Sequence, residues 1–303
     1  MDGTFSQCPR LFSQIYVIRV QLRDFFITAV YVFMTNKSQQ LYNDMFTILQ
    51  QYGLANNITL NPEIVMTDFE LAPRRAINDV FGHQVEMKAC YFHLTQSSWR
   101  KIAELGLSNV YKNDENVRHF VGMVNGLAFL PIADLEEGLL YLYANIPGND
   151  NSIQNFLTYF DEIYCRGKFR AVPQNNAVAV MLRRSPPLFP PNLWNVFEAT
   201  INGDARTNNV CEGWNHSFAN MVGHANPSIW TVIKSFQADR ALAIDTARRI
   251  ENGQPPTVRT KRHTAGLQGR LRNICMNLNN GVTTVPLALR AIGHCIFLTR
   301  LFN

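Results

Sequence analysis

The sequence lacks several features that would assign it to whole classes of protein. No run of 18 or more apolar residues occurs, so no transmembrane helix is predicted. The N-terminus has neither the basic nor the apolar region of a signal peptide. Only six cysteines are scattered along 303 residues, which excludes a dense disulfide framework and predicts reduced intracellular thiols. Internal repeats and low-complexity tracts are also absent, so repeat and solenoid architectures are not expected.

The composition is that of a globular protein with unevenly distributed charge. Hydrophobic residues make up 47% and charged residues 17%, and the length suffices for one or two domains. From Ser228 to the C-terminus there are 11 Lys and Arg against 3 Asp and Glu, a net of +8, so residues 1–227 carry −3 of the total +5. A basic segment beside a slightly acidic core suits a polyanion-binding surface. The alternative is a solvated helical face that is basic without a partner.

The first part of the chain alternates between strand and helix patterns. Strands are predicted around residue 2 and at 11–20, 24–34, 64–68 and 85–91, and helices at 38–52, 73–81 and 95–105. Residues 21–23 suit a hairpin turn, Ser38 is expected to cap its helix, and Gly53 to end it. Residues 25–33 are apolar almost throughout, so we expect that strand to be buried on both faces. This order predicts an α/β fold, a mixed sheet flanked by helices.

The first strand is unusual because only Met1 precedes Asp2. The apolar half of a sheet strand is missing there. We therefore expect an N-terminally truncated fragment or an incomplete gene model.

Beyond residue 114 the pattern becomes helical. Helices are predicted at 117–129, 135–143 and 153–164, around 194–197, around 212, and from 229 to about 249, with one or two more after a polar loop at 251–263. The segment 185–191 holds four prolines, which excludes helix and central strand and predicts an extended connector.

One acid stands in a position that favours a ligand site. Ile64-Val65-Met66-Thr67 runs directly into Asp68, and a helical pattern follows. A carboxylate at the carboxyl end of a buried strand is held rigidly at the rim of the sheet, where open α/β sheets bind their ligands. The alternative for Asp68 is a turn or helix-capping residue.

Two further acids make metal chemistry plausible if the fold gathers them. Should Asp2, Asp68 and Glu212 converge, three carboxylates would repel one another strongly unless cations were bound. Oxygen ligands with room for water suit Mg²⁺ or Mn²⁺. Two such ions roughly 3.5–4 Å apart clamp the attacking and leaving oxygens of a phosphodiester displacement, which predicts strand cleavage by water and joining by a 3′-hydroxyl.

Asp2 and Glu212 also have structural alternatives. Asp2 precedes Gly3 and has the position of an ordinary turn acid. Asn209-Val-Cys-Glu212 fits an N-cap residue followed by an acid at the third helical position, a capping box. The helix that follows is expected to bury Val210, Trp214 and Phe218 on one stripe, with Glu212 off that stripe in either role.

Several motifs occur together in an order found in a known family. They are Asp2-Gly-Thr-Phe with Pro9, Phe12 and Gln14, then Lys37, Tyr42, Thr67-Asp-Phe-Glu70, Cys90-Tyr-Phe-His93 and Thr207-Asn-Asn-Val-Cys-Glu-Gly-Trp214. This series closely resembles the Mutator-like element (MULE) transposase domain, of the type found beside FLYWCH zinc fingers in animals. The resemblance extends to about residue 250.

The resemblance implies a fold, a site and a function. It implies an RNase H-like core with Asp2, Asp68 and Glu212 as catalytic residues and metal ligands for two Mg²⁺ or Mn²⁺ ions. An all-helical insertion is implied between the second and third acids. The expected division is 1–114 for the first part of the core, 115–205 for the insertion, 206–227 for the helix of the third acid, and 228–303 for a basic helical extension. The implied partner is DNA at transposon ends, bound in the nucleus by a homo-oligomer and without a membrane.

Cys90 and His93 form the Cys-x-x-His signature of that family. A Cys and a His three residues apart supply two of the four ligands of a structural zinc site, with Cys211 and His216 as candidates for the rest. We favour the alternative, a buried thiol and a histidine hydrogen-bonded at a strand-to-helix turn. His216 would share the helix face of Glu212, near DNA or the metal, although a surface or core histidine is the commoner case.

The basic C-terminal segment supplies the candidates for phosphate contacts. They are Arg240, Arg248, Arg249, Arg259, Lys261 and Arg262. No helix-turn-helix or complete zinc finger pattern occurs, so we expect sequence-specific recognition of transposon ends to lie outside this chain.

Three functional hypotheses follow. The first is the catalytic domain of a DDE-type transposase. The second is a transposase-derived protein that binds DNA or chromatin without cutting it, which the incomplete first strand favours. The third, a plain RNase H-like nuclease, is disfavoured by the large insertion and the Cys-x-x-His pair.

Overall fold

The N-terminal region forms an antiparallel sheet, because two runs rich in β-branched and aromatic residues are joined by a tight turn. In the computed structural model the strands are β1 (Asp2–Thr4), β2 (Gln14–Leu22) and β3 (Phe25–Met34), with β2 in the middle. Asp2 and Tyr31 are both register partners of Val17. Arg23 has a φ of 54° in the turn. The predicted hairpin is confirmed.

The structure describes the chain except for residues 149–150, 173–180, 205, 207–208, 257–261 and 300–303. The side chains of residues 172, 181, 209–210, 212, 262–263 and 297–299 also lie outside the description.

A second sheet is parallel and is built from the strand that precedes Asp68. The helices and strands of this part are α1 (Gln39–Ala55), β4 (Ile64–Thr67), α2 (Leu71–Phe81) and β5 (Glu86–Ala89), and β4 pairs with β5. The Ser38 hydroxyl caps α1 by accepting from Leu41 N at 3.3 Å, as predicted. Gly53 does not end α1, which continues to Ala55 and has Asn56 as its C-cap; the next residue, Asn57, has a φ of 58°.

The expectation that β3 is buried on both faces is wrong. Met34 and Thr28 are buried, Ala29 is exposed, and most of the strand is half-buried. The reason is the strand order, because β3 lies at the edge of its three-stranded sheet.

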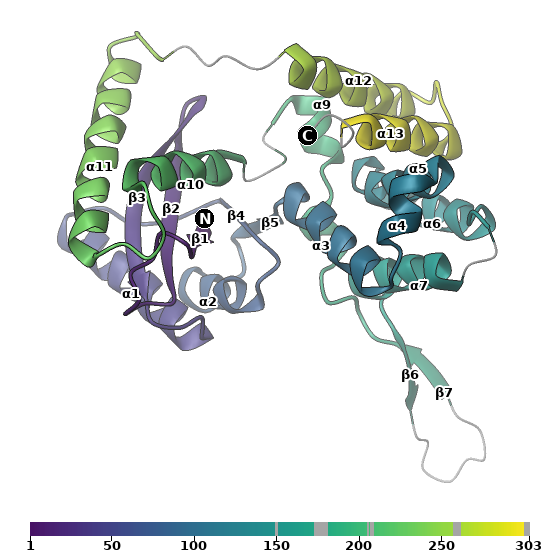
Figure 1. The fold of residues 1–303 in the computed structure, drawn as a ribbon, viewed down its shortest axis with the longest axis horizontal. Coiled ribbons are helices and arrows are strands. Elements are labelled where there is room, and N and C mark those ends of the chain that lie inside the picture. Colours follow the sequence, from purple (N-terminus) through teal and green to yellow (C-terminus); the bar gives the residue numbers. More distant parts are fainter. Residues whose placement is uncertain (149–150, 173–180, 205, 207–208, 257–261, 300–303) are drawn as a thin grey trace. The chain divides into compact units, whose positions relative to one another are not determined.

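Two compact units divide the chain. Unit 1 comprises Met1–Cys90 and Thr207–Arg259, and unit 2 comprises Tyr91–Arg206 and Thr260–Asn303. Unit 1 contains both sheets together with α1, α2, α10 (Asn209–Val222) and α11 (Ile229–Glu251) (Figure 1).

Alternating side chains of β2 divide the core of unit 1 in two. Tyr16 and Ile18 join an apolar cluster with residues of α1 and α2, including Phe46. Ile15 and Val17 face the other way and join a cluster with Trp214, Phe218 and Val232 from α10 and α11. The period of two along the strand thus places α1 and α2 over one face of the sheet and α10 and α11 over the other.

Unit 2 is mainly helical. Its helices are α3 (Tyr91–Glu104), α4 (Ser108–Asn113), α5 (Glu115–Gly126), α6 (Leu135–Ala144), α7 (Asn151–Phe160), α8 (Pro191–Trp194), α9 (Phe197–Asn202), α12 (Arg262–Asn279) and α13 (Val285–Thr299). Helices α5 and α13 pack closely, since a Cβ on Gly122 would lie 2.6 Å from the carbonyl oxygen of Gly293. Trp194 is fully buried and donates to the carbonyl oxygen of Tyr164 at 2.9 Å.

Two expectations for residues 115–205 need correction. The stretch is not all-helical, because β6 (Phe169–Val172) and β7 (Met181–Arg184) form an antiparallel pair within it. The helix expected around 194–197 is two short helices, separated where the Asn195 side chain accepts from Phe197 N at 3.0 Å. The extended connector before Pro191 and the helices after residue 228 are confirmed. In the described part of the chain, no helix has the length and apolar character needed to cross a membrane.

Candidate active site

Asp2 lies on β1 with its carboxylate buried and held by neutral donors. The side chain is 9% exposed. Its Oδ1 accepts a hydrogen bond from Gly3 N at 2.8 Å, and its Oδ2 accepts one from the Asn215 side-chain amide at 2.9 Å. Among the described residues, no Lys, Arg or His side chain forms an ion pair with Asp2. The partner amide comes from α10, so this helix contacts the first strand of unit 1.

Asp68 lies beside the same strand. The Met1 ammonium donates to the carbonyl oxygen of Met66 at 2.8 Å, which joins the start of β1 to β4 just before Asp68. Asp68 Oδ1 accepts from Glu70 N at 3.1 Å, so the acid also closes the turn that leads into α2. The predicted turn role is therefore present together with the predicted position at the carboxyl end of a strand.

The turn of α10 that contains position 212 lies against β1. Cys211 is buried, and burial raises the pKa of its thiol, with the Met1 ammonium lowering that pKa and Asp2 raising it. Asn215, four residues on, contacts Asp2 directly. Its other amide atom, Oδ1, is buried and has no hydrogen-bond partner among the described residues. The side chain of Glu212 lies outside the description, so its predicted role stays a prediction.

A series of hydrogen-bonded polar side chains lies near the two aspartates. The Gln14 side-chain amide donates to the Tyr42 hydroxyl at 2.8 Å, and that hydroxyl donates to Glu70 Oε2 at 3.5 Å. Lys37 pairs with the other oxygen of Glu70 and lies 4.4 Å from the centre of the Phe5 ring. The sequence motifs contained all of these residues but assigned them no role.

Gln14 also explains the glycine after Asp2. A Cβ on Gly3 would lie 2.4 Å from Gln14 Oε1, closer than any real contact of this kind. A side chain at position 3 would therefore displace either Gln14 or the strand that carries Asp2.

The electrostatics of one nearby tyrosine, Tyr16, relate Asp2 and Asp68 to the same region of unit 1. Burial raises the pKa of Tyr16 well above its usual value, and the charges of Tyr42, Asp68, Asp2 and Glu70 raise it further. Both aspartates thus act on the same buried hydroxyl. Because the neutral tyrosine is favoured, it adds no charge to this acidic region.

Asp239 positions α10 and was not predicted. It accepts hydrogen bonds from the Tyr31 hydroxyl on β3 and from the indole N–H of Trp214 at 2.8 Å. Burial raises the pKa of Tyr31, and the hydrogen bond to Asp239 and the charge of Asp239 raise it further. One carboxylate on α11 therefore ties α10 to the sheet. Asp239 and Asn215 were missed because nothing local marks them, and each partner is remote in the sequence.

The other predicted residues are not gathered into one site by the described contacts. Cys90 is buried at the end of the first segment of unit 1. His93 belongs to unit 2, and its Nδ1 is buried without a hydrogen-bond partner among the described residues. His216 is exposed on α10. Among the described residues, which do not include the side chain of Glu212, no group of three or more His, Cys, Asp and Glu is arranged to hold a metal ion.

The candidate phosphate-binding residues are only partly described. Arg240, Arg248 and Arg249 are exposed on α11. Arg259 and Lys261 lie outside the described residues, as does the side chain of Arg262. The exposed part of this set is thus available to solvent from a single helix.

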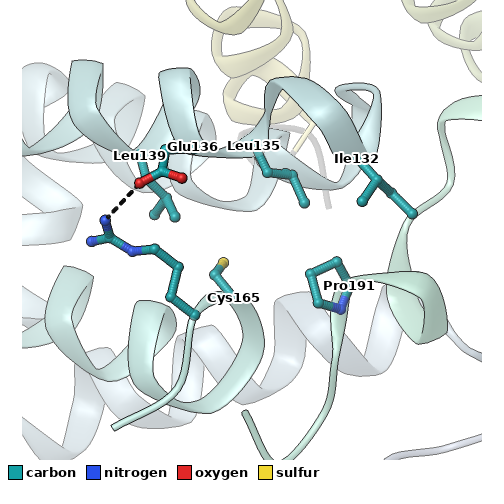
Figure 2. Close-up of a pocket in the computed structure, with 7 residues that line it drawn as sticks. Ile132, Leu135, Glu136, Leu139, Cys165 and Pro191 are labelled. Atoms are coloured by element: carbon teal, nitrogen blue, oxygen red, sulfur yellow. Dashed lines mark ion pairs between the residues drawn. The ribbon is translucent and has the colours of Figure 1, made fainter. Parts of the chain in front are cut away.

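A separate cavity of about 180 Å³ lies within unit 2 (Figure 2). It is lined by Ile132, Leu135, Glu136, Leu139, Cys165, Arg166 and Pro191. Arg166 lies 3.6 Å from Glu136 across its edge, and burial raises the pKa of the Cys165 thiol. The neutral thiol and the mostly apolar lining indicate side-chain packing between helices rather than a binding site. None of the predicted acids lines this cavity.

The comparisons with known proteins address the N-terminal third of the chain. No curated protein and no solved structure gives a significant match. The region that matches a family model contains Asp2 and Asp68 and ends before Glu212, and the resemblance beyond it, to about residue 250, stays a prediction. Residues 1–97 match the MULE transposase domain, which confirms the family resemblance there and relates this chain to transposases.

Proposed function

We propose that unit 1 is the catalytic part of a DDE-type transposase, in which Asp2, Asp68 and Glu212 hold two Mg²⁺ or Mn²⁺ ions for DNA strand cleavage and strand transfer. The observation that carries the proposal is the hydrogen bond between Asn215 and Asp2. It brings the α10 turn that contains position 212 to the strand of the first acid. Position 212 lies about 60° around the helix from position 215.

The donor set fits a hard divalent cation. Mg²⁺ and Mn²⁺ prefer carboxylate and amide oxygens. Asp2 supplies a buried carboxylate without a cationic side-chain partner among the described residues. Asn215 Oδ1 is a buried oxygen without a described partner next to it. A buried unpaired carboxylate and a buried unsatisfied carbonyl each cost free energy, and a cation would relieve both costs.

Bound ions would lower the pKa of an attacking water or DNA 3′-hydroxyl and would stabilise the negative charge on the leaving oxygen. The chain's own residues hold the arrangement. Gln14 restricts position 3, Asp68 fixes the turn into α2, and Asp239 holds α10 against the sheet. Such fixed placement of charged groups lowers the reorganisation needed during reaction.

The strand arrangement supports an RNase H-like core as part of this proposal. Strands β1, β2 and β3 are antiparallel, β4 and β5 are parallel, and the bond from Met1 to Met66 joins the β1 and β4 edges. A mixed order β3-β2-β1-β4-β5 would follow. It would place Asp2 and Asp68 on adjacent strands.

The DNA contacts and the cellular setting are further parts of the proposal. Arg240, Arg248 and Arg249 would contact phosphates from α11, together with Arg259, Lys261 and Arg262. The substrate would be transposon ends, the compartment the nucleus, and the active form a homo-oligomer. The exposed charge of the three α11 arginines supports the DNA contact.

A second candidate is a transposase-derived protein that binds DNA or chromatin without cutting. It is favoured by the two hydrogen bonds to Asp2, because Gly3 and Asn215 already satisfy both carboxylate oxygens. A carboxylate kept only as a structural acceptor would need no ion.

Nicking of supercoiled plasmid DNA in Mg²⁺ or Mn²⁺ tests the two candidates. Removal of a metal-binding acid should reduce nicking by at least about 100-fold, since catalysis by bound metal ions accounts for several kcal/mol of transition-state stabilisation. The variants are Asp68→Ala and Glu212→Ala. Asp245→Ala, at an exposed acid of α11, is the matched control and should keep full activity. Equal nicking in all variants would reject the metal-site assignment, whereas DNA binding without any nicking by the wild type would favour the second candidate.

A further inference from the structure

Strands β6 and β7 form a two-stranded ribbon that projects from the helices of unit 2 (Figure 1). Every described side chain on it is exposed, including Phe169 at 55% and Leu182 at 65%. The segment from Ile163 to Phe197 contains no Asp or Glu, so the ribbon carries positive charge alone. A ribbon of this kind contributes little to a core.

The register places three of the cationic residues on one face. Arg170 is directly opposite Arg183, and the pairing continues through the bond from Ser185 N to the carbonyl oxygen of Lys168 at 2.9 Å. Directly opposed residues share a face of an antiparallel pair, as do residues two apart on one strand. Lys168, Arg170 and Arg183 therefore form a cationic face.

Among the described residues, this face has internal compensation only at Lys168. Lys168 is 4.0 Å from Glu162, and neither Arg170 nor Arg183 forms an ion pair there. Like charges directly opposite each other destabilise a strand pair, and an isolated two-stranded ribbon is marginally stable. The opposed arginines weaken the ribbon unless a polyanion neutralises them.

The other face is different in character. Phe169 is opposite Arg184, whose guanidinium lies 4.5 Å from the centre of the Phe169 ring. Leu182 lies on the same face, two residues from Arg184. The cation over the ring keeps Arg184 on the ribbon, so its charge adds to the potential of the cationic face.

We propose that the β6–β7 ribbon is a DNA-binding arm whose cationic face contacts the phosphates of a duplex. The choice of DNA as the polyanion rests on the proposed function, whereas the need for a polyanion follows from the ribbon. The major groove, about 12 Å wide, admits a two-stranded ribbon, whose strands are about 4.8 Å apart. The arm is distinct from the α11 arginines and belongs to the other unit.

The first test is the salt dependence of duplex binding. Fluorescence anisotropy of the full chain with a random-sequence DNA duplex, between about 50 and 200 mM salt, gives the slope of log affinity against log salt. The Arg170→Gln/Arg183→Gln variant should lower the steepness by about 1.8, since each phosphate contact contributes about 0.9. The control Arg100→Gln/Lys112→Gln removes two exposed cations from α3 and α4 of the same unit and should leave the slope unchanged. Equal slopes in both variants overturn the proposal.

A second variant separates phosphate contact from ribbon stability. Arg170→Glu places an acid opposite Arg183, which should strengthen the strand pair. DNA affinity should nevertheless fall, by about tenfold or more, because a phosphate contact becomes a repulsion. Unchanged DNA affinity overturns the proposal. A change in the sedimentation mass of the protein with an unchanged salt slope also overturns it, because that result would point to a protein partner. Absence of nicking by the wild type would reject the proposed function alone, and the slope difference would still report on the arm.

Discussion

Asp161 in unit 2 and Asp2 in unit 1 are both buried, with 4% and 9% of their surface exposed, but their partners differ. Asp161 accepts from Arg166 Nε at 2.9 Å and from the Tyr143 hydroxyl at 3.1 Å. Among the described residues, the hydrogen-bond donors to Asp2 are neutral groups, Gly3 N and the Asn215 amide. The first carboxylate has an arginine as its counter-charge, and among the described residues the second forms no ion pair with a cationic side chain.

This difference separates a structural acid from a candidate ligand. A buried charge is costly unless it is paired, so a chain that retains an unpaired one gains something else from it. Asp161 raises the pKa of Arg166 and holds the chain in a π-helical turn at Asp161–Cys165. On the proposed function, a bound cation would supply the counter-charge of Asp2.

The largest expected effect is the loss of the paired charge in unit 2. Asp161→Asn leaves the partly buried Arg166 with only the exposed Glu136 as an acidic partner among the described residues, so the free energy of unfolding should fall by about 3 kcal/mol. Urea unfolding followed by circular dichroism measures this. Glu137→Gln, at an exposed acid of α6, is the control and should change stability little. A loss no greater than in that control would show that the pair at Asp161 is not structural.

Asp2→Asn should behave in the opposite way. In metal-free buffer this substitution should not destabilise the protein. It removes the buried negative charge of Asp2, and the amide oxygen of the new side chain can still accept a hydrogen bond. The wild type should gain about 2.7 kcal/mol of stability when Mn²⁺ is present at 100 times its dissociation constant, and the variant should lose that gain.

Thermal unfolding with and without Mn²⁺ measures this difference without any need for activity. Asp161→Asn serves as the comparison and should keep its response to Mn²⁺. An equal stabilisation of Asp2→Asn and the wild type would remove the contrast between the two aspartates.

Asp239 sharpens the comparison because its hydrogen-bond donors are also neutral. Tyr31 and Trp214 donate to it, while the charge of Arg19 also lies within electrostatic range. We expect Asp239→Asn to cost about 1.5 kcal/mol of stability through weaker hydrogen bonds to a charged acceptor. The response to Mn²⁺ in thermal unfolding should persist. Its loss would mean that neutral donors around an acid do not distinguish a ligand from a structural residue.

The smallest expected effect is a pH dependence of unit 2. His119 stacks on His294 with ring centres 3.9 Å apart, and its Nε2 lies 2.9 Å from the carbonyl oxygen of Arg290. Burial lowers the pKa of His119, which the charges of His294 and Arg290 lower further, while the Arg290 carbonyl and Glu115 raise it.

The sign follows from proton uptake. Between the lowered pKa of the folded state and the ordinary value of about 6.5, the unfolded chain binds more protons. The contribution of His119 is therefore complete above about pH 6.5 and declines as the pH falls. Unfolding at about pH 7.5 and 5.5 should show a smaller decline for His119→Gln than for the wild type. The control His224→Gln, at an exposed histidine, should retain the decline of the wild type.

Local sequence patterns predicted the elements well where one physical cause dominates. The cap at Ser38, the hairpin of β2 and β3, and the strand before Asp68 each depend on neighbours a few residues apart. The failures had non-local causes. The half-buried state of β3 depends on its edge position in the sheet. The β6–β7 ribbon has both faces exposed, so its sequence carries no alternation between buried and exposed positions.

The candidate site was predictable only in its residue types. Asp2 and Asp68 could be named from their motifs, and residues 1–97 could be related to the MULE transposase domain. Asn215, Asp239 and the ribbon could not be assigned roles in this way. Their partners lie on other elements, and no spacing rule connects positions 2 and 215 or positions 31 and 239.

The sequence by itself determined the identities of the acids, the alternation along β2 and the charge of each segment, because these depend on residue type and short spacings. Only the tertiary structure decided that Asp2 is buried against an amide of α10, that Asp161 is paired, and that Arg170 is opposite Arg183. The physical reason is that the cost of burying a charge depends on what surrounds it in space. Those surroundings are assembled from segments up to 213 residues apart.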